Sequence, residues 1–131
     1  EPEPKAALPK RVLVVDDETD LTDMLALMLE LRGYTADVAG NAAQAMERLT
    51  REHYDALVLD IQLPGAMNGA DLFKYAAAAY PETAQRTLFI TADTMNFETR
   101  RFLDSVTQPS MTKPFLAYEF ADRVDALFKD G

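Results

Sequence analysis

The sequence contains no cysteine and no tryptophan, and none of its apolar runs is as long as a membrane span. Without cysteine, a disulfide scaffold, a thiolate metal site and a cysteine nucleophile are excluded. The lack of a long apolar run and of a signal peptide predicts a cytoplasmic protein without direct membrane contact. Basic residues are few: the sequence has 13 Lys and Arg and 22 Asp and Glu, which gives a net charge of −9. This balance argues against direct binding of nucleic acid, which needs a positive surface.

The 131 residues, of which 48% are hydrophobic, are sufficient for one domain with a substantial core. Residues 1–10 (EPEPKAALPK) are rich in Pro, Glu and Lys, which predicts an extended linker or tail before a domain over residues 11–131. A tether to a preceding domain and a simple tail are equally compatible with this composition. The chain begins with Glu1 rather than Met, which favours the tether.

Apolar runs and helical spacing alternate along the rest of the sequence. Strands are predicted at 12–15, 34–38, 56–59, 88–90 and 110–112. Apolar stripes predict helices that include residues 21–31, 42–49, 71–80, 97–104 and 116–127. The stripe of the first helix consists of Leu21, Met24, Leu25, Met28 and Leu31, and that of the last consists of Leu116, Phe120, Val124 and Leu127. Thr19 or Asp20 could cap the first helix, Asn41 could cap the second, and Pro81 should end the third. This alternation predicts a doubly wound α/β fold with a parallel sheet.

Polar residues follow the predicted strands at positions that should meet at one edge of the sheet. The first strand leads into Asp16-Asp17-Glu18, and later strands end in Asp60, Thr91 and Lys113. Ligands of open α/β sheets bind beyond the carboxyl ends of the strands. Each residue alone could be a helix-terminal charge or a turn residue. Their coincidence predicts a functional site.

The chemistry that fits these residues is phosphoryl transfer onto the carboxylate of Asp60. The carboxylates of Asp16 and Asp17 would be costly beside it without a counter-ion, and Mg²⁺ suits carboxylate oxygens and waters. The metal would also neutralise charge on the incoming phosphoryl group. Lys113 would offer a positive charge to one phosphoryl oxygen, and Thr91 would offer a hydroxyl to another.

The segments that carry these residues resemble the receiver domain of bacterial two-component response regulators. The matching segments are VLVVDDE (12–18), DALVLDIQLPG (55–65), Asn68-Gly69, FITAD (89–93) and TKPF (112–115). Each segment alone is common, but all five in this order form a specific pattern over about residues 11–128. The resemblance implies a flavodoxin-like fold, with a five-stranded parallel sheet of order 2-1-3-4-5 and five helices.

The resemblance also implies a Mg²⁺-dependent role for the acidic residues. Asp60 matches the aspartate that accepts a phosphoryl group from a histidine kinase or a histidine phosphotransfer protein. Asp17 and Asp60 match direct ligands of Mg²⁺, and Asp16 matches a ligand that acts through water. The backbone carbonyl of Gln62 falls at the position of the third protein ligand.

Further roles are implied for residues around the phosphoryl group. Thr91 and Lys113 match the pair that holds the phosphoryl oxygens, and Thr91 matches the switch hydroxyl. The side chains of Gln62 and Asp93 fall at positions that tune the lifetime of the acyl phosphate. The peptide bond before Pro114 is commonly cis in this family.

Two features of the sequence depart from the family pattern. Ser110 stands three residues before Lys113, where the family usually has the Tyr or Phe that moves inward on activation. The loop PGAMNG (64–69) is one residue longer than the common form. Output is therefore expected to depend on movement of the loop after Thr91, while the phosphorylation chemistry should be unaffected.

The sequence therefore predicts a phosphoacceptor signalling domain rather than an enzyme. A C-terminal receiver of a hybrid histidine kinase is favoured over a free-standing regulator, and homodimerisation is left open. A pseudo-receiver that acts only as an interaction module is the main alternative, although all five site residues are present. An aspartate-nucleophile phosphatase ranks last, because Gln62 stands where such enzymes place a second aspartate.

Overall fold

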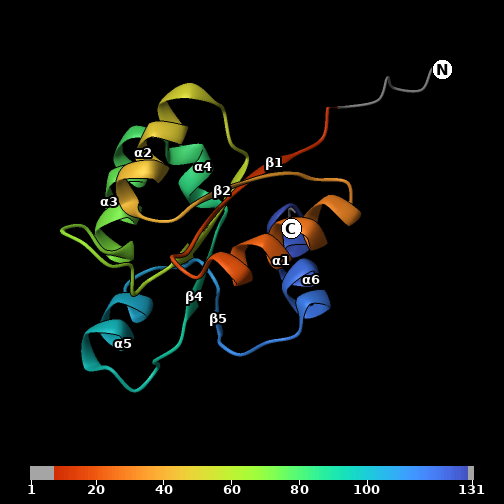
Figure 1. Cartoon of the computed structure of the whole chain (residues 1–131). Coiled ribbons are helices and arrows are strands. Elements are labelled where there is room, and N and C mark those ends of the chain that lie inside the picture. The colour runs from red at the N-terminus through yellow and green to blue at the C-terminus, as the bar shows by residue number, and fades with distance from the viewer. Residues whose placement is uncertain (1–7, 130–131) are drawn as a thin grey trace.

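A five-stranded parallel sheet lies between two layers of helices in the computed structural model, which describes residues 8–129 (Figure 1). The strands are β1 (Arg11–Val15), β2 (Thr35–Ala39), β3 (Ala56–Asp60), β4 (Thr87–Thr91) and β5 (Ser110–Thr112). They are arranged in the order β2-β1-β3-β4-β5, which confirms the predicted doubly wound, flavodoxin-like fold. Most of the predicted linker lies outside the described residues, so the boundary at residue 10 stays a prediction.

Residues 8–129 form six helices where five were predicted. They are α1 (Thr19–Leu31), α2 (Ala42–Arg51), α3 (Gly69–Ala79), α4 (Pro81–Gln85), α5 (Phe97–Asp104) and α6 (Ala117–Leu127). The additional helix is the five-residue α4, which starts at the proline expected only to end α3. Proline disrupts a helix interior but suits a first helical turn, where its missing N–H needs no partner. None of these helices combines the length and the apolar composition that a bilayer crossing requires.

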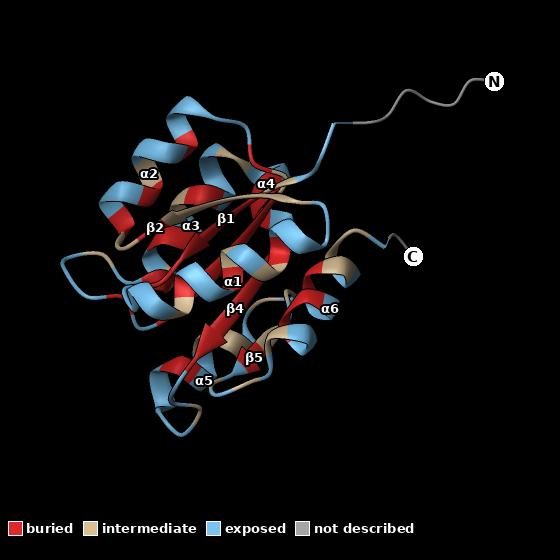
Figure 2. Cartoon of the chain, turned by 45° about the vertical axis from the view of Figure 1, so that its right-hand side comes forward, coloured by how far each residue is buried: buried red, intermediate tan, exposed pale blue. Residues whose placement is uncertain are grey.

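Alternate residues of β1, β3 and β4 contribute to two separate hydrophobic cores. Val12 and Val14 face α1 and α6, whereas Leu13 and Val15 face the layer that contains α2 and α3. Figure 2 shows the buried strands at the centre and the exposed outer sides of the helices. Burial on both faces explains why the strands read as continuous apolar runs in the sequence.

Two predictions for α1 are wrong in detail. The side chains of Met24 and Leu31 are exposed, whereas Leu25 is buried as predicted and Leu29, which was not part of the predicted stripe, is buried as well. The helix carries more apolar residues than its one buried face can use, so the stripe could not be assigned from spacing alone. Neither predicted cap residue caps the helix: the N-cap is Glu18, without a side-chain cap hydrogen bond.

Other helix ends follow the sequence more closely. The side chain of Asn41 accepts a hydrogen bond from the backbone N–H of Gln44, so the predicted cap of α2 is confirmed. In α6, Phe120 and Val124 are buried as the stripe requires, but Leu116 is the exposed N-cap residue and lies outside the helix.

The amino end of the sheet holds a network of complementary polar groups. The guanidinium of Arg11 lies 3.0 Å from Asp37, and the buried phenol of Tyr54 donates to the same carboxylate at 2.6 Å. Burial, followed by the hydrogen bond to Asp37, raises the pKa of Tyr54 above its usual value. We call Arg11, Asp37 and Tyr54 the amino-end network. It ties the start of β1 and the residues before β3 to edge strand β2.

Candidate functional site

The register of the sheet brings the predicted site residues to one edge. Val15 pairs with Leu59 across β1 and β3, so Asp16 and Asp60, which follow them, lie side by side. On the other side, Thr91 of β4 pairs with Thr112 of β5, and Lys113 is the next residue. Parallel pairing therefore aligns the carboxyl ends of strands that are distant in the sequence.

A tight approach of α3 to the end of β3 also shapes this edge. Gly69, the first residue of α3, donates its N–H to the carbonyl of Ile61 at 3.0 Å. A Cβ at this position would overlap the backbone carbonyl of Asp60. Asn68 fixes the start of the helix through a capping box with Asp71. Glycine at position 69 thus lets the 64–69 loop return close to Asp60.

Three carboxylates form an acidic cluster at this edge. Asp16 and Asp60 are buried, with exposed fractions of 1% and 4%, and Asp17 is exposed. One oxygen of each carboxylate lies within 4.8 Å of the others. We call Asp16, Asp17 and Asp60 the acidic cluster. The structure thus brings together the three side chains predicted to surround Mg²⁺.

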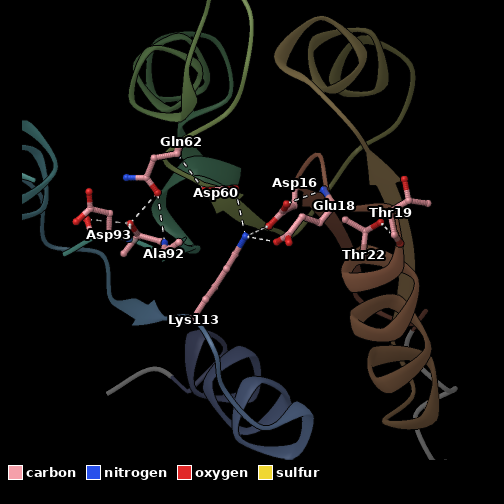
Figure 3. Close-up of polar contacts among 10 residues, drawn as sticks. Asp16, Glu18, Thr19, Thr22, Asp60, Gln62, Ala92, Asp93 and Lys113 are labelled. Atoms are coloured by element: carbon pink, nitrogen blue, oxygen red, sulfur yellow. Dashed lines mark hydrogen bonds and ion pairs between the residues drawn. The ribbon is translucent and has the colours of Figure 1, made fainter. Parts of the chain in front are cut away.

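The side chain of Lys113 extends into the acidic cluster (Figure 3). Its Nζ lies 2.7 Å from Oδ2 of Asp16, 2.8 Å from Oε1 of Glu18 and 3.4 Å from Oδ2 of Asp60. Burial alone would lower the pKa of Lys113, but contacts with these carboxylates outweigh burial and raise it. Lys113 is therefore held as a cation at neutral pH. The bond between Lys113 and Pro114 is cis, as the resemblance implies.

Competing effects act on the pKa of the Asp60 carboxylate. Burial raises its pKa most, and the neighbouring Asp16 raises it further. The N–H of Gln62, which donates to Oδ1 of Asp60 at 2.9 Å, and the ammonium of Lys113 oppose this rise. The two oxygens thus face different donors, a backbone amide and an ammonium. A buried carboxylate with few waters around it is more nucleophilic than one in bulk solvent.

The donor set at the acidic cluster fits a hard divalent cation. Oδ2 of Asp16 makes the ion pair with Lys113 but has no hydrogen bond of good geometry among the described residues. One ammonium faces the acidic cluster and also Glu18, so negative charge is in excess. Oxygen ligands with room for waters are the surroundings that Mg²⁺ prefers. The backbone carbonyl of Gln62 as a further ligand stays a prediction.

A second, uncharged group of side chains lies beside the acidic cluster. The hydroxyl of Thr91 donates to Oε1 of Gln62 at 2.8 Å, and Nε2 of Gln62 donates to Oγ1 of Thr99 at 2.9 Å. Thr99, in the first turn of α5, was not predicted from the sequence. Its contact depends on the reach of Gln62 across the gap between the β3–α3 loop and α5. No motif or spacing in the sequence indicates it.

Asp93 and Ser110 are the two remaining residues that the sequence singled out. The carboxylate of Asp93 accepts from the backbone N–H groups of Met95 and Asn96, so it is engaged in its own loop. Its tuning role stays a prediction. Ser110 is half-buried in β5, opposite Phe89 of β4.

Several known proteins are similar to this chain. The family model described as the response regulator receiver domain matches residues 12–125. The sensory transduction protein RegX3 of Mycolicibacterium smegmatis is 32% identical over 120 residues, which are 92% of this chain and 51% of that protein. The DNA-binding response regulator MtrA of Mycobacterium tuberculosis is 32% identical over 117 residues, 89% of this chain and 50% of that protein. The chain thus spans about half the length of these curated relatives.

Solved structures agree with this result. A CheY-like receiver domain protein from Methanospirillum hungatei is 26% identical, with a TM-score of 0.78 over 94% of this chain and 99% of that one. The response regulator TrrA of Thermotoga maritima, solved in complex with Mg²⁺ and beryllofluoride, is 26% identical, with a TM-score of 0.77 over 91% of this chain and 99% of that one.

Proposed function

Because the chain belongs to the response regulator receiver domain family, we propose that it accepts a phosphoryl group on Asp60 and changes its conformation in response. The observation that carries the residue assignment is the position of Asp60. Its carboxylate is 4% exposed, lies against the ammonium of Lys113, and shares an edge of the sheet with Asp16 and Asp17. Phosphoryl transfer to a carboxylate requires a nucleophile with a cationic group and potential metal ligands beside it, and Asp60 has these neighbours.

In the proposed reaction, a carboxylate oxygen of Asp60 attacks phosphorus. The new O–P bond forms as the bond from phosphorus to the donor breaks, and an imidazole donor leaves with a proton from solvent. Lys113 remains charged and can move its ammonium from the carboxylates to a phosphoryl oxygen. Thr91 can donate its hydroxyl to another phosphoryl oxygen when it turns away from Gln62.

We further propose that Mg²⁺ is held by Asp17 and Asp60 directly, by Asp16 through water, and by the backbone carbonyl of Gln62. When bound, the metal would neutralise charge on the transferred group. Its site has support from the acidic cluster and from the excess of carboxylates over ammonium groups. The protein chain itself supplies the nucleophile, the cationic side chain and the hydroxyl donor.

Histidine kinases supply the phosphoryl group to response regulators, and we propose a histidine kinase or a histidine phosphotransfer protein as the donor for this chain. RegX3 and MtrA are regulators of about twice this length, and MtrA is by name a DNA-binding protein. With its net charge of −9, the present chain is not expected to contact DNA itself. Attachment to a histidine kinase, homodimerisation and a cytoplasmic location stay predictions.

Mass spectrometry after incubation with acetyl phosphate and Mg²⁺ tests the phosphoacceptor. The wild-type chain should gain one phosphoryl group, a mass increase of about 80 Da. Asp60→Asn should show no increase, because the amide is not a nucleophile for phosphorus. Asp23→Asn, at an exposed position on α1, is the matched control and should be modified like the wild type.

Three outcomes would contradict the proposal. An unmodified wild-type chain would favour a pseudo-receiver that acts only through contacts. Undiminished modification of Asp60→Asn would place the acceptor elsewhere. Continuous hydrolysis of a phosphate ester, without a stable adduct, would favour a phosphatase.

A further inference from the structure

We propose that Thr99 is a positioning residue that holds the carboxamide of Gln62 against Thr91, so that the first turn of α5 responds to the state of Asp60. The proposal rests on the proposed phosphorylation of Asp60. It assigns a role to Thr99, which no motif in the sequence indicates. The hydrogen bonds from Thr91 to Gln62 and from Gln62 to Thr99 are its starting point.

Both polar atoms of the Gln62 carboxamide are hydrogen-bonded to hydroxyl groups. Its Oε1 accepts from Thr91 at 2.8 Å, and the backbone N–H of Ala92 lies 3.4 Å away on the same side. Its Nε2 donates to Thr99 at 2.9 Å. The backbone N–H of Ala92 can only donate, so Oε1 faces Ala92 and Thr91, and the NH₂ end is left to donate to Oγ1 of Thr99. Figure 3 shows the carboxamide oxygen directed toward the Ala92 backbone.

The two anchors of this arrangement are themselves fixed. The backbone N–H of Gln62 donates to Asp60, so the base of the side chain follows the phosphorylation site. The backbone N–H of Thr99 donates to the side chain of Asn96, which caps α5. Thr99 is 5% exposed and is the one buried residue among the eight of α5. A contact with Thr99 therefore bears on how the whole helix is seated.

Phosphorylation would compete for the hydroxyl of Thr91. A hydroxyl has one proton to donate, so Thr91 cannot serve both Gln62 and a phosphoryl oxygen. When it turns to the phosphoryl group, Oε1 of Gln62 keeps only the longer hydrogen bond from the N–H of Ala92, and the carboxamide can rotate away from Thr99. The start of α5 then loses a polar contact with the β3–α3 loop. This path does not need an aromatic ring on β5, where Ser110 stands.

Titration with beryllofluoride in the presence of Mg²⁺ tests this role, with amide resonances of residues 92 and 97–104 followed by NMR. Thr99→Val removes the hydroxyl at nearly constant shape. It should tighten beryllofluoride binding by about two- to tenfold, the range of one hydrogen bond, because Gln62 holds Thr91 less firmly in the free protein. It should also reduce the shifts that the ligand causes in α5. Thr99→Ser should bind like the wild type.

A double-mutant comparison separates positioning from a general effect on folding. In a Gln62→Ala background, Thr99→Val should change the affinity no further, since the carboxamide that it positions is absent. Thr83→Val removes an equally buried hydroxyl on α4 and should leave the affinity unchanged. An unchanged affinity in Thr99→Val, or an equal effect in both backgrounds, would overturn the role of Thr99. Failure of the wild type to bind beryllofluoride or to form the acetyl phosphate adduct would instead count against the phosphoacceptor assignment.

Discussion

The two ends of the sheet differ in how their charged side chains are paired. In the amino-end network, Asp37 meets a guanidinium at 3.0 Å and a phenol at 2.6 Å, so a half-buried carboxylate has complementary partners. At the carboxyl end, Asp16 and Asp60 are more deeply buried, and Lys113 is shared between them and Glu18. Burial raises the pKa of Asp60, which shows that its charged form is disfavoured there.

This difference indicates that the amino-end network stabilises the fold, whereas the acidic cluster is suited to binding a cation. Complementary pairs contribute to stability without any other component, whereas like charges close together oppose folding until a cation joins them. The carboxyl end therefore depends on close backbone packing to hold its carboxylates together. Its geometry should be sensitive to small steric changes, and its stability should respond to Mg²⁺.

Substitution of Gly69 should have the largest effect. In Gly69→Ala, the new methyl group would overlap the carbonyl of Asp60, and backbone atoms of β3 or α3 must move. We expect a loss of about 3 kcal/mol in the free energy of unfolding, measured by urea denaturation, and a marked loss of the phosphoryl adduct.

Gly40→Ala is the matched control for this change. The nearest atom to a methyl group there is Oε1 of Gln44, at an ordinary contact distance of 3.5 Å. Its stability should change by less than about 1 kcal/mol. If both variants lost stability equally, the close approach of α3 to β3 would not explain the requirement for glycine at position 69.

Addition of Mg²⁺ should stabilise the carboxyl end by an intermediate amount. At 100 times its dissociation constant, a ligand that binds only the folded state adds about 2.7 kcal/mol to the free energy of unfolding. We expect this gain in the wild type, reversible by chelation, and its loss in Asp17→Asn. Asp37→Asn should lower stability at the amino end but keep the full response to Mg²⁺. A response retained by Asp17→Asn would argue against the proposed metal ligands.

The contrast between the two ends also explains what the sequence could predict. Asp16, Asp60 and Lys113 were placed together correctly, because each follows a strand and parallel register aligns strand ends. The strands were found because they are buried on both faces. In contrast, the exposure of Leu31 depends on how α1 is rotated against the sheet, which apolar spacing does not determine for a helix rich in leucine.

Side-chain contacts across the fold could not be predicted in the same way. Thr99 reaches Gln62 only because α5 is seated beside the β3–α3 loop. The pairing of Tyr54 with Asp37 likewise joins a residue before β3 to a strand two positions away in the sheet. Neither pair lies in a motif, and both depend on three-dimensional packing. Motifs thus identified the charged site, but not the neutral contacts around it.

Removal of one phenol from the amino-end network should have the smallest effect and a distinct pH dependence. Tyr54→Phe loses one hydrogen bond to Asp37 and should cost about 1 kcal/mol at pH 7. Since the folded state raises the pKa of Tyr54, folding favours the neutral phenol. This contribution is complete below the unfolded pKa of about 10 and is lost as the pH rises above it. Denaturation between pH 7 and 11 should therefore show a shallower alkaline decline in Tyr54→Phe than in the wild type. Tyr118→Phe, at an exposed position on α6, is the control and should reproduce the wild-type curve. Identical slopes for all three proteins would show that Tyr54 does not contribute to the loss of stability at alkaline pH.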